Sequence, residues 1–128
     1  MKRFIGSLAT VVFIVALTFP FGDMQGHTHW QKVTWIPFTG MLRLTDLVAN
    51  VALYLPWGIC WGVGRERWRF AGCLMTAMLL STAMEFAQVW SHWRFPSATD
   101  ITMNICGAAL GFWLGDRSSR QRAAGSRQ

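Results

Sequence analysis

The chain has 128 residues and a formal net charge of +6, yet only 14% of its residues are charged and 52% are hydrophobic. In an average soluble domain about a quarter of the residues are charged, and so high an apolar content excludes an intrinsically disordered chain. The same hydrophobicity argues against a soluble basic protein that binds nucleic acid, so we expect no nucleic-acid partner. The length is that of one domain.

Four stretches with almost no charge predict four transmembrane helices, and hence an all-α membrane protein built as a four-helix bundle. They cover residues 4–22, 45–64, 70–93 and 100–116. A helix needs about 17–25 mostly apolar residues to cross the hydrocarbon core of a bilayer, which the first three provide. The fourth is shorter and requires local thinning of the bilayer. No small-x-small cleavage site follows the first stretch, so we expect an uncleaved helix rather than a signal peptide.

The positive charges predict that both ends of the chain lie in the cytoplasm. Cytoplasmic loops of membrane proteins are enriched in Lys and Arg. With this orientation nine cations lie inside, namely Lys2, Arg3, Arg65, Arg67, Arg69, Arg117, Arg120, Arg122 and Arg127, and three outside, namely Lys32, Arg43 and Arg94. We therefore expect a multi-pass transmembrane domain over residues 1–116 and a disordered, basic cytoplasmic tail over residues 117–128.

The cysteines and histidines predict neither a metal site nor another cofactor. The spacing of Cys60, Cys73 and Cys106 fits no zinc or haem motif, so we interpret them as small buried hydrophobic residues. His27 and His29 alone are two ligands on a loop, which is a poor metal site.

Glycines at four-residue spacing predict close helix packing. Gly58 and Gly62 share a face of the second helix, and Gly107, Gly111 and Gly115 share a face of the fourth. Small residues let helix backbones approach closely where lipid provides no hydrophobic drive. We expect packing within the chain, with a homodimer through the same glycine faces as the alternative.

The few polar residues of the spans are predicted to gather at the outer end of the bundle. They are Asp46 and Asn50 on the second helix, Ser81, Glu85 and Gln88 on one face of the third, Asp100 and Asn104 on the fourth, and Arg94 just beyond the third. A charge within the bilayer costs about 2.5–3.5 kcal/mol on insertion scales, so acids there are usually paired and functional.

Each of these polar residues also has a structural interpretation. Asp46 and Asp100 would be favourable at helix N-termini, and the amides would form interhelical hydrogen bonds. Ser97 and Asp100 together resemble a capping box at the start of the fourth helix. Glu85 has no such capping role in the sequence, which makes it the strongest functional candidate.

Three sequence patterns together resemble signatures of the VanZ-like family of small polytopic bacterial membrane proteins. The first is Asp46-x3-Asn50 followed by Pro56-x-Gly58. The second is Ser81-x3-Glu85-x2-Gln88. The third is Arg94, Ser97, Asp100, Asn104, Gly107 and Gly111, in that order and spacing. Trp35-Ile36-Pro37-Phe38 is similar to a segment of the family's outer loop. The resemblance covers residues from about 33 to 115 and implies a multi-pass protein of the bacterial inner membrane, with a family-level link to susceptibility to teicoplanin-type glycopeptides.

Three functions remain open from the sequence. The chain would bind or modify an envelope lipid or glycan precursor at the outer leaflet, with membrane lipids as its surroundings; or it would be a small transporter or channel; or it would be a non-catalytic membrane scaffold. For the first, the candidate catalytic residues are Glu85, Asp46 and Asp100, and the candidate ligand-binding residues are Asn50, Gln88, Arg94, Asn104 and Ser81. Whether the protein is an enzyme stays open.

Overall fold

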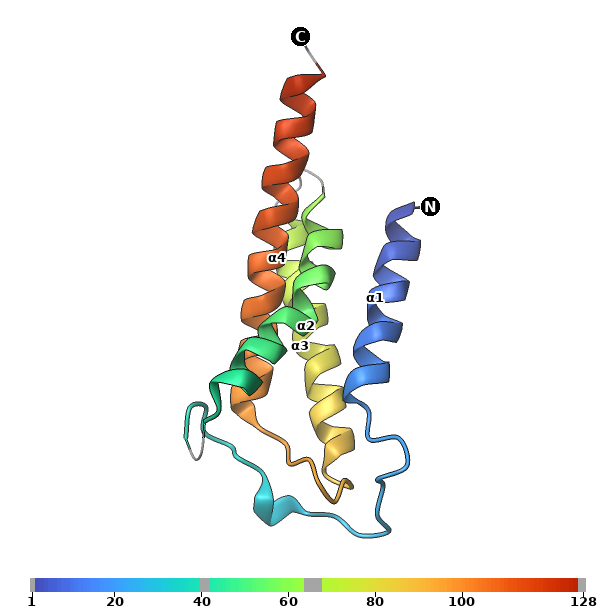
Figure 1. Ribbon diagram of the computed structural model, residues 1–128, viewed down its shortest axis with the longest axis vertical. Helices are drawn as coiled ribbons and strands as arrows, with labels where there is room; N and C mark the ends of the chain where they lie inside the picture. Colours follow the sequence, from blue (N-terminus) through green and yellow to red (C-terminus); the bar gives the residue numbers. More distant parts are fainter. Residues whose placement is uncertain (1, 40–41, 64–67, 127–128) are drawn as a thin grey trace.

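The structure is a computed structural model that describes residues 2–39, 42–63 and 68–126, with side chains from residue 6 onward. It consists of four α-helices and a short 3-10 helix: α1 (Lys2–Thr18), η1 (Trp30–Lys32), α2 (Leu44–Gly62), α3 (Trp68–Gln88) and α4 (Ala98–Gly125). This confirms the all-α class and the four predicted helices. Figure 1 shows that α1 begins and α4 ends toward one end of the bundle, with the long α1–α2 connection at the other.

The helices end where local chemistry stops them, so two of them are shorter than predicted. α1 ends at Thr18 and not at residue 22, because Pro20 disfavours helical geometry in the residue before it. α3 ends at Gln88 and not at residue 93, because the following turn bonds to the α1–α2 connection, whose Asp23 accepts hydrogen bonds from Ser91 and its neighbours.

The predicted disorder from residue 117 is wrong for residues 117–125, where α4 continues as a helix to Gly125. The segment contains Arg, Gln and Ala, which favour helix. Asp116 also forms a salt bridge of 2.8 Å with Arg120 one turn later. The helix therefore projects beyond the other three at this end (Figure 1).

The most extensive helix contact joins α2 and α4, and glycines on both sides make it possible. A Cβ added to Gly58 would overlap the backbone oxygen of Ala108, and one added to Gly111 would overlap the backbone oxygen of Leu55. Gly62, Gly107 and Gly115 meet backbone atoms of the opposite helix in the same way. The predicted packing within the chain is confirmed, and a homodimer through these faces would have to displace α2 from α4.

A small core lies where α1, α2, α3 and α4 converge. Its buried members are Ile14, Tyr54, Trp57, Cys73, Ala77 and Ala108. Cys73 is fully buried as expected, but Cys60 is only partly buried and Cys106 is exposed, so the prediction of three buried cysteines is confirmed for Cys73 alone. At helical spacing, Cys106 lies on the side of α4 away from its glycine face.

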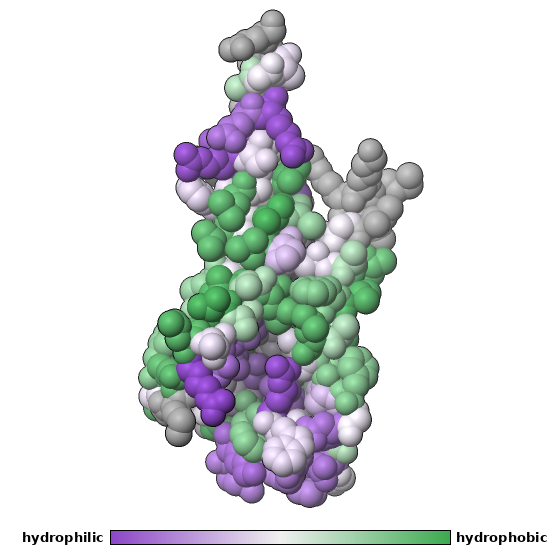
Figure 2. Space-filling model, viewed as in Figure 1, coloured by the Kyte–Doolittle hydropathy of each residue, from purple (hydrophilic) through white to green (hydrophobic). Residues whose placement is uncertain are grey.

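Much of the apolar surface faces outward. Large hydrophobic side chains are exposed on every helix, among them Leu8, Phe13, Val48, Ile59, Met75, Leu79, Leu110 and Leu114. On the face that Figure 2 shows, a hydrophobic band lies between hydrophilic ends. Within the described residues, α3 alone has the length and apolar composition of a membrane-spanning helix, and the apolar part of α1, Gly6–Thr18, is shorter.

Candidate functional site

A polar cavity of about 420 Å³ lies between α2, α3 and α4 at the end of the bundle that carries the α1–α2 connection. Seven of the eight predicted site residues line it: Asp46, Asn50, Glu85, Gln88, Arg94, Asp100 and Asn104. It appears as a hydrophilic hollow near the lower end of Figure 2. The eighth, Ser81, is fully buried and accepts a hydrogen bond from Asn104. The structure thus brings together residues that are far apart in the sequence.

Glu85 is buried at the wall of the cavity, with 7% of its surface exposed. One carboxylate oxygen accepts a hydrogen bond of 2.7 Å from the backbone N–H of Ser97, the residue that caps α4. The Ser97 side chain accepts in turn from the Thr99 N–H at 3.2 Å. The serine half of the predicted capping box is therefore confirmed, but Glu85 takes the place expected for Asp100. The expectation that Glu85 has no capping role is wrong.

Asn104 lies at the floor of the cavity, only 4% exposed. Its amide nitrogen donates a hydrogen bond of 2.8 Å to the Ser81 hydroxyl, which links α4 to α3. Its amide oxygen has no partner among the described residues. The buried Tyr54 hydroxyl lies near Ser81 and also lacks a hydrogen bond of ordinary geometry. Buried polar atoms are normally paired, so these two can serve a ligand or water in the cavity.

Asp46 and Asp100 begin α2 and α4, and both lie in the first turn. Asp46 is exposed, whereas Asp100 is half-buried beside Asn50 and faces Asp46 across the cavity. Carboxylate and amide groups in this arrangement can accept and donate hydrogen bonds to the hydroxyls of a ligand. Among the described residues no three His, Cys, Asp or Glu side chains are grouped so as to hold a metal ion.

Gln88 and Arg94 both bind the end of α1. The Gln88 amide donates to the Thr18 carbonyl at 3.2 Å, and the Arg94 guanidinium donates to the carbonyls of Leu17 and Thr18 at 3.2 and 3.4 Å. The last carbonyls of a helix lack partners within it, and a cation there is favourable. These two predicted ligand-binding residues thus also position α1 at the cavity.

The α1–α2 connection is held against the α3–α4 turn by Asp23. Its carboxylate accepts a hydrogen bond of 2.5 Å from the Ser91 hydroxyl and bonds of 3.2 Å from the backbone N–H groups of His92 and Trp93. The Ser91 bond, the backbone bonds and the nearby His92 hold the pKa of Asp23 below its ordinary value. Isolated bridges join Met24 to Ser91 and Thr34 to Ser97.

His29 lies in the same connection and is 8% exposed. Its backbone N–H donates to Val89 at 2.9 Å, and its ring lies 4.8 Å from that of His27 and 6.4 Å from that of His92. Burial, followed by the charges of Lys32 and the two histidines, lowers the pKa of His29 below 6.5. The neutral imidazole is the form that this loop accommodates.

Two residues of the cavity were missed from the sequence. Arg43 lines the wall beside Asp46, although the sequence shows it only as one of three outer cations. Tyr54 follows Asn50 by one helical turn on α2, and this spacing is the signal that places it on the same face. Arg43 adds a second guanidinium to the cavity that the three carboxylates line.

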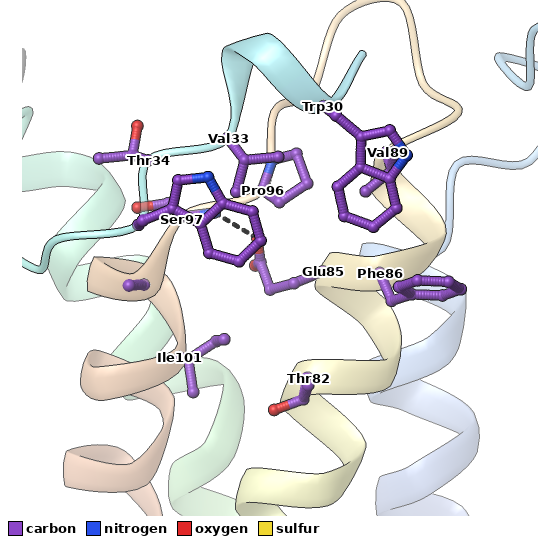
Figure 3. Close-up of a pocket in the computed structure, with 12 residues that line it drawn as sticks. Trp30, Val33, Thr34, Thr82, Glu85, Phe86, Val89, Pro96, Ser97 and Ile101 are labelled. Carbon is purple, nitrogen blue, oxygen red and sulfur yellow. Dashed lines mark hydrogen bonds between the residues drawn. The ribbon is translucent and has the colours of Figure 1, made fainter. Parts of the chain in front are cut away.

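A second, smaller cleft of about 130 Å³ lies between α3 and α4 beneath η1. Figure 3 shows Trp30 and Phe86 on one side of it, Ile101 of α4 on the other, Thr82 below Glu85 on α3, and Pro96 and Ser97 above Glu85. Its exposed surface is almost wholly apolar. Glu85 lines both this cleft and the polar cavity.

One comparison with known proteins gives a match, and it covers the fold and the cavity described above. No curated protein and no solved structure matches the chain. A model of the VanZ/LLP1 family matches residues 4–116. This span contains α2 and α3, α1 from residue 4 onward, α4 down to Asp116, and every residue of the polar cavity. The chain therefore belongs to the VanZ/LLP1 family.

Proposed function

We propose that this chain is a multi-pass protein of the bacterial inner membrane that binds an envelope lipid or glycan precursor in its polar cavity at the outer leaflet. The observation that carries the proposal is the convergence of three carboxylates, three amides and two arginines on one cavity at one end of the bundle. Ionisable groups at membrane depth are energetically costly, so those that are present are usually paired and functional.

The orientation follows from the charges at the two ends. Arg69, Arg117, Arg120 and Arg122 lie toward the end where α1 begins and α4 finishes, opposite the cavity. Arg65, Arg67 and Arg127 lie outside the described residues, as do the side chains of Lys2 and Arg3. By the positive-inside rule the basic end faces the cytoplasm, so the cavity opens on the outer side. The exposed apolar band between the ends supports insertion of the whole bundle.

In this proposal different residues of the cavity bind different parts of the ligand. Arg43 and Arg94 would bind a phosphate or carboxylate, as guanidinium groups do best. Asp46, Asp100 and Asn50 would bind hydroxyl or amide groups of the head. The Asn104 oxygen would accept one more hydrogen bond at the floor. Glu85 would cap α4 and would also be the acid at the cavity wall. If the protein modifies its ligand, Glu85 would transfer a proton as general acid or base.

One set of contacts favours the alternative of a non-catalytic scaffold. Glu85 binds Ser97, Asn104 binds Ser81, and Gln88 binds Thr18. Each contact connects two helices or a helix and a turn, as interhelical hydrogen bonds in membranes do. In a scaffold these residues would matter only through stability, whereas in a binding protein Arg94 and Asp46 would matter at normal protein level.

The test is a deletion strain profiled against glycopeptides and envelope stresses, then complemented with wild type, Glu85→Gln, Arg94→Ala or Arg122→Ala. We expect wild type and Arg122→Ala to restore the profile, because Arg122 lies far from the cavity on the projecting part of α4. Glu85→Gln and Arg94→Ala should fail at an unchanged protein level measured by immunoblot. Full complementation by both would overturn the proposal. Failure with parallel loss of protein would favour the scaffold.

The orientation has its own test. Single cysteines at Gln31 and Ser118, in a chain without its native cysteines, are labelled with a membrane-impermeant maleimide in intact spheroplasts. We expect labelling at position 31 and protection at 118 until the membrane is opened. The reverse pattern would place the cavity on the cytoplasmic side.

A further inference from the structure

The polar cavity and the apolar cleft meet at a single side chain. Glu85 lines both, and its carboxylate is held at the boundary by the Ser97 N–H at 2.7 Å. Ser97 lines the cleft and also a neighbouring polar hollow, which shares Arg43, Asp46 and Asp100 with the cavity. The polar cavity and the apolar cleft therefore lie next to each other, with the contact between Glu85 of α3 and Ser97 at the start of α4 as their boundary.

The cleft has the position and composition of a chain-binding slot. Trp30 and Phe86 at its side are 44% and 53% exposed, and their rings contact each other at a centroid distance of 5.8 Å. It lies between α3 and α4 (Figure 3). At about 130 Å³ the space has room for a segment of one hydrocarbon chain and not for the paired chains of a bulk phospholipid.

The charged residues of the cavity indicate which kind of head group it can bind. Arg43 and Arg94 make no salt bridge in the described part of the chain, where the one such pair joins Asp116 and Arg120. The guanidinium of Arg94 is bonded only to backbone carbonyls. Both arginines are therefore open to an anion. The three carboxylates would repel a doubly charged phosphate monoester, whereas a singly charged phosphodiester carries less charge.

The remaining groups fit sugar hydroxyls. Asp46, Asp100 and the amide of Asn50 can bond to hydroxyl groups as acceptors or donors. The Asn104 oxygen, buried and without a partner in the described residues, points to one missing donor at the floor. Trp93 at the cavity wall offers an aromatic face.

We propose that the ligand is a single-chain glycosyl phospholipid, with its sugar among Asp46, Asn50, Asp100 and Asn104, its phosphodiester at Arg43 and Arg94, and its chain in the cleft beside Glu85. This rests on the proposed function and narrows it to one ligand class. A phosphate without a sugar, a sugar without a phosphate, and a head group without a chain would each use only part of the site.

The experiment is calorimetric titration of the whole chain in phosphatidylcholine nanodiscs. The probes are dodecyl phosphodiesters of glucose and of N-acetylglucosamine, with dodecyl phosphate, dodecyl glucoside and the methyl phosphodiester of glucose as truncated controls. We expect at least one diester to bind and each truncated control to bind at least about tenfold more weakly. Binding of dodecyl phosphate as tight as the diester, or binding of neither diester, would overturn the proposal.

Variants separate the chain from the head group. Ile101→Trp fills the cleft, while Leu110→Trp places the same side chain on an exposed part of α4. Ile101→Trp should weaken binding of the dodecyl diesters at least about tenfold and leave binding of the methyl phosphodiester of glucose unchanged, since only apolar burial is lost. Unchanged diester affinity in Ile101→Trp would refute the chain slot.

The complementation assay distinguishes failure of this proposal from failure of the proposed function. A strain in which Ile101→Trp complements fully while Arg94→Ala does not would refute the chain slot and leave the envelope function standing. Full complementation by Ile101→Trp, Arg94→Ala and Glu85→Gln alike would refute both.

Discussion

The Glu85 carboxylate and the Ser97 backbone N–H, from two different elements, form a hydrogen bond of 2.7 Å that closes the start of α4. In a capping box this N–H is bound by the residue three positions into the same helix, here Asp100. A side chain of α3 does so instead, which leaves Asp100 free to face Asn50 and Asp46 in the cavity. One long-range contact thus both fixes α3 to α4 and releases a carboxylate for the site.

Replacement of Glu85 tests this contact. Glu85→Ala removes the acceptor and leaves the Ser97 N–H without a partner, so we expect the free energy of unfolding to fall by about 1–3 kcal/mol. Glu85→Gln keeps an acceptor oxygen at the same reach and should lose less. Unfolding in mixed micelles measures both, with Glu85→Ala and Glu85→Gln as a matched pair. Equal losses would show that the hydrogen bond does not support α4.

The Ser81–Asn104 bond predicts energetic coupling between α3 and α4. Both side chains are buried and bonded at 2.8 Å. Ser81→Ala and Asn104→Ala should each destabilise the bundle, and the double variant should lose less than their sum by about 0.6 kcal/mol, the average for interhelical bonds in a membrane. Ser81→Ala combined with Ser119→Ala serves as the control pair, since Ser119 lies in the projecting part of α4 and its losses should add.

The glycine contact between α2 and α4 predicts a strong effect of single methyl groups. Gly58→Ala and Gly111→Ala would each place a Cβ against the opposite backbone. Backbone gives way less easily than side chains, so we expect losses of about 1–3 kcal/mol or more in the free energy of unfolding. Gly125→Ala is the control, because a Cβ there meets no atom within 4 Å. A neutral result for Gly58→Ala would mean that the helices are further apart than described.

His29 predicts a pH-dependent loosening of the α1–α2 connection. Its pKa in the folded chain is lowered below 6.5, the ordinary value, by burial and by Lys32, His27 and His92. Below pH 6.5 the unfolded loop therefore takes up the proton that the folded loop resists, so stability is complete above that pH and declines as the pH falls toward the lowered pKa.

Hydrogen exchange measured at several pH values is the check on this prediction. The backbone N–H of His29, bonded to Val89, should lose protection between pH 6.5 and lower values in the wild type. His29→Gln has no titrating ring and should show no such loss. A pH response that persists in His29→Gln would show that His29 is not its source.

Local sequence patterns predict the helices of this chain well, because uncharged runs of apolar residues have few other ways to satisfy their backbone. The spacing of Asp46 and Asn50, and of Asp100 and Asn104, correctly predicts shared helix faces. The glycine spacing on α2 and α4 predicts their contact. The predicted helix ends are less accurate, since Pro20 and the turn after Gln88 end α1 and α3 early, and residues 117–125 are helical rather than disordered.

The contacts between distant segments lie beyond such patterns. Nothing near Glu85 in the sequence indicates that Ser97 is its partner, because the pairing depends on how the α3–α4 turn folds back. The attachment of Gln88 and Arg94 to the end of α1 depends equally on tertiary packing. The place of Arg43 in the cavity required the relative position of α2 and α4, which spacing along one helix does not give.

The attachment of the α1–α2 connection to the α3–α4 turn sets an order for assembly during synthesis. The Phe38 N–H bonds to the side chain of Thr99, a residue made 61 positions later. At about 5–20 residues per second this contact has to wait roughly 3 to 12 seconds after Phe38 is added. Until then the segment that joins the first two helices can bond only to residues 89–96, for example through Asp23 to Ser91 and through His29 to Val89. The last helix to emerge is thus the one that completes the first loop, and a chain cut short before residue 97 would lack the bond from Phe38 to Thr99 and the bond from the Ala98 N–H to the Thr34 carbonyl.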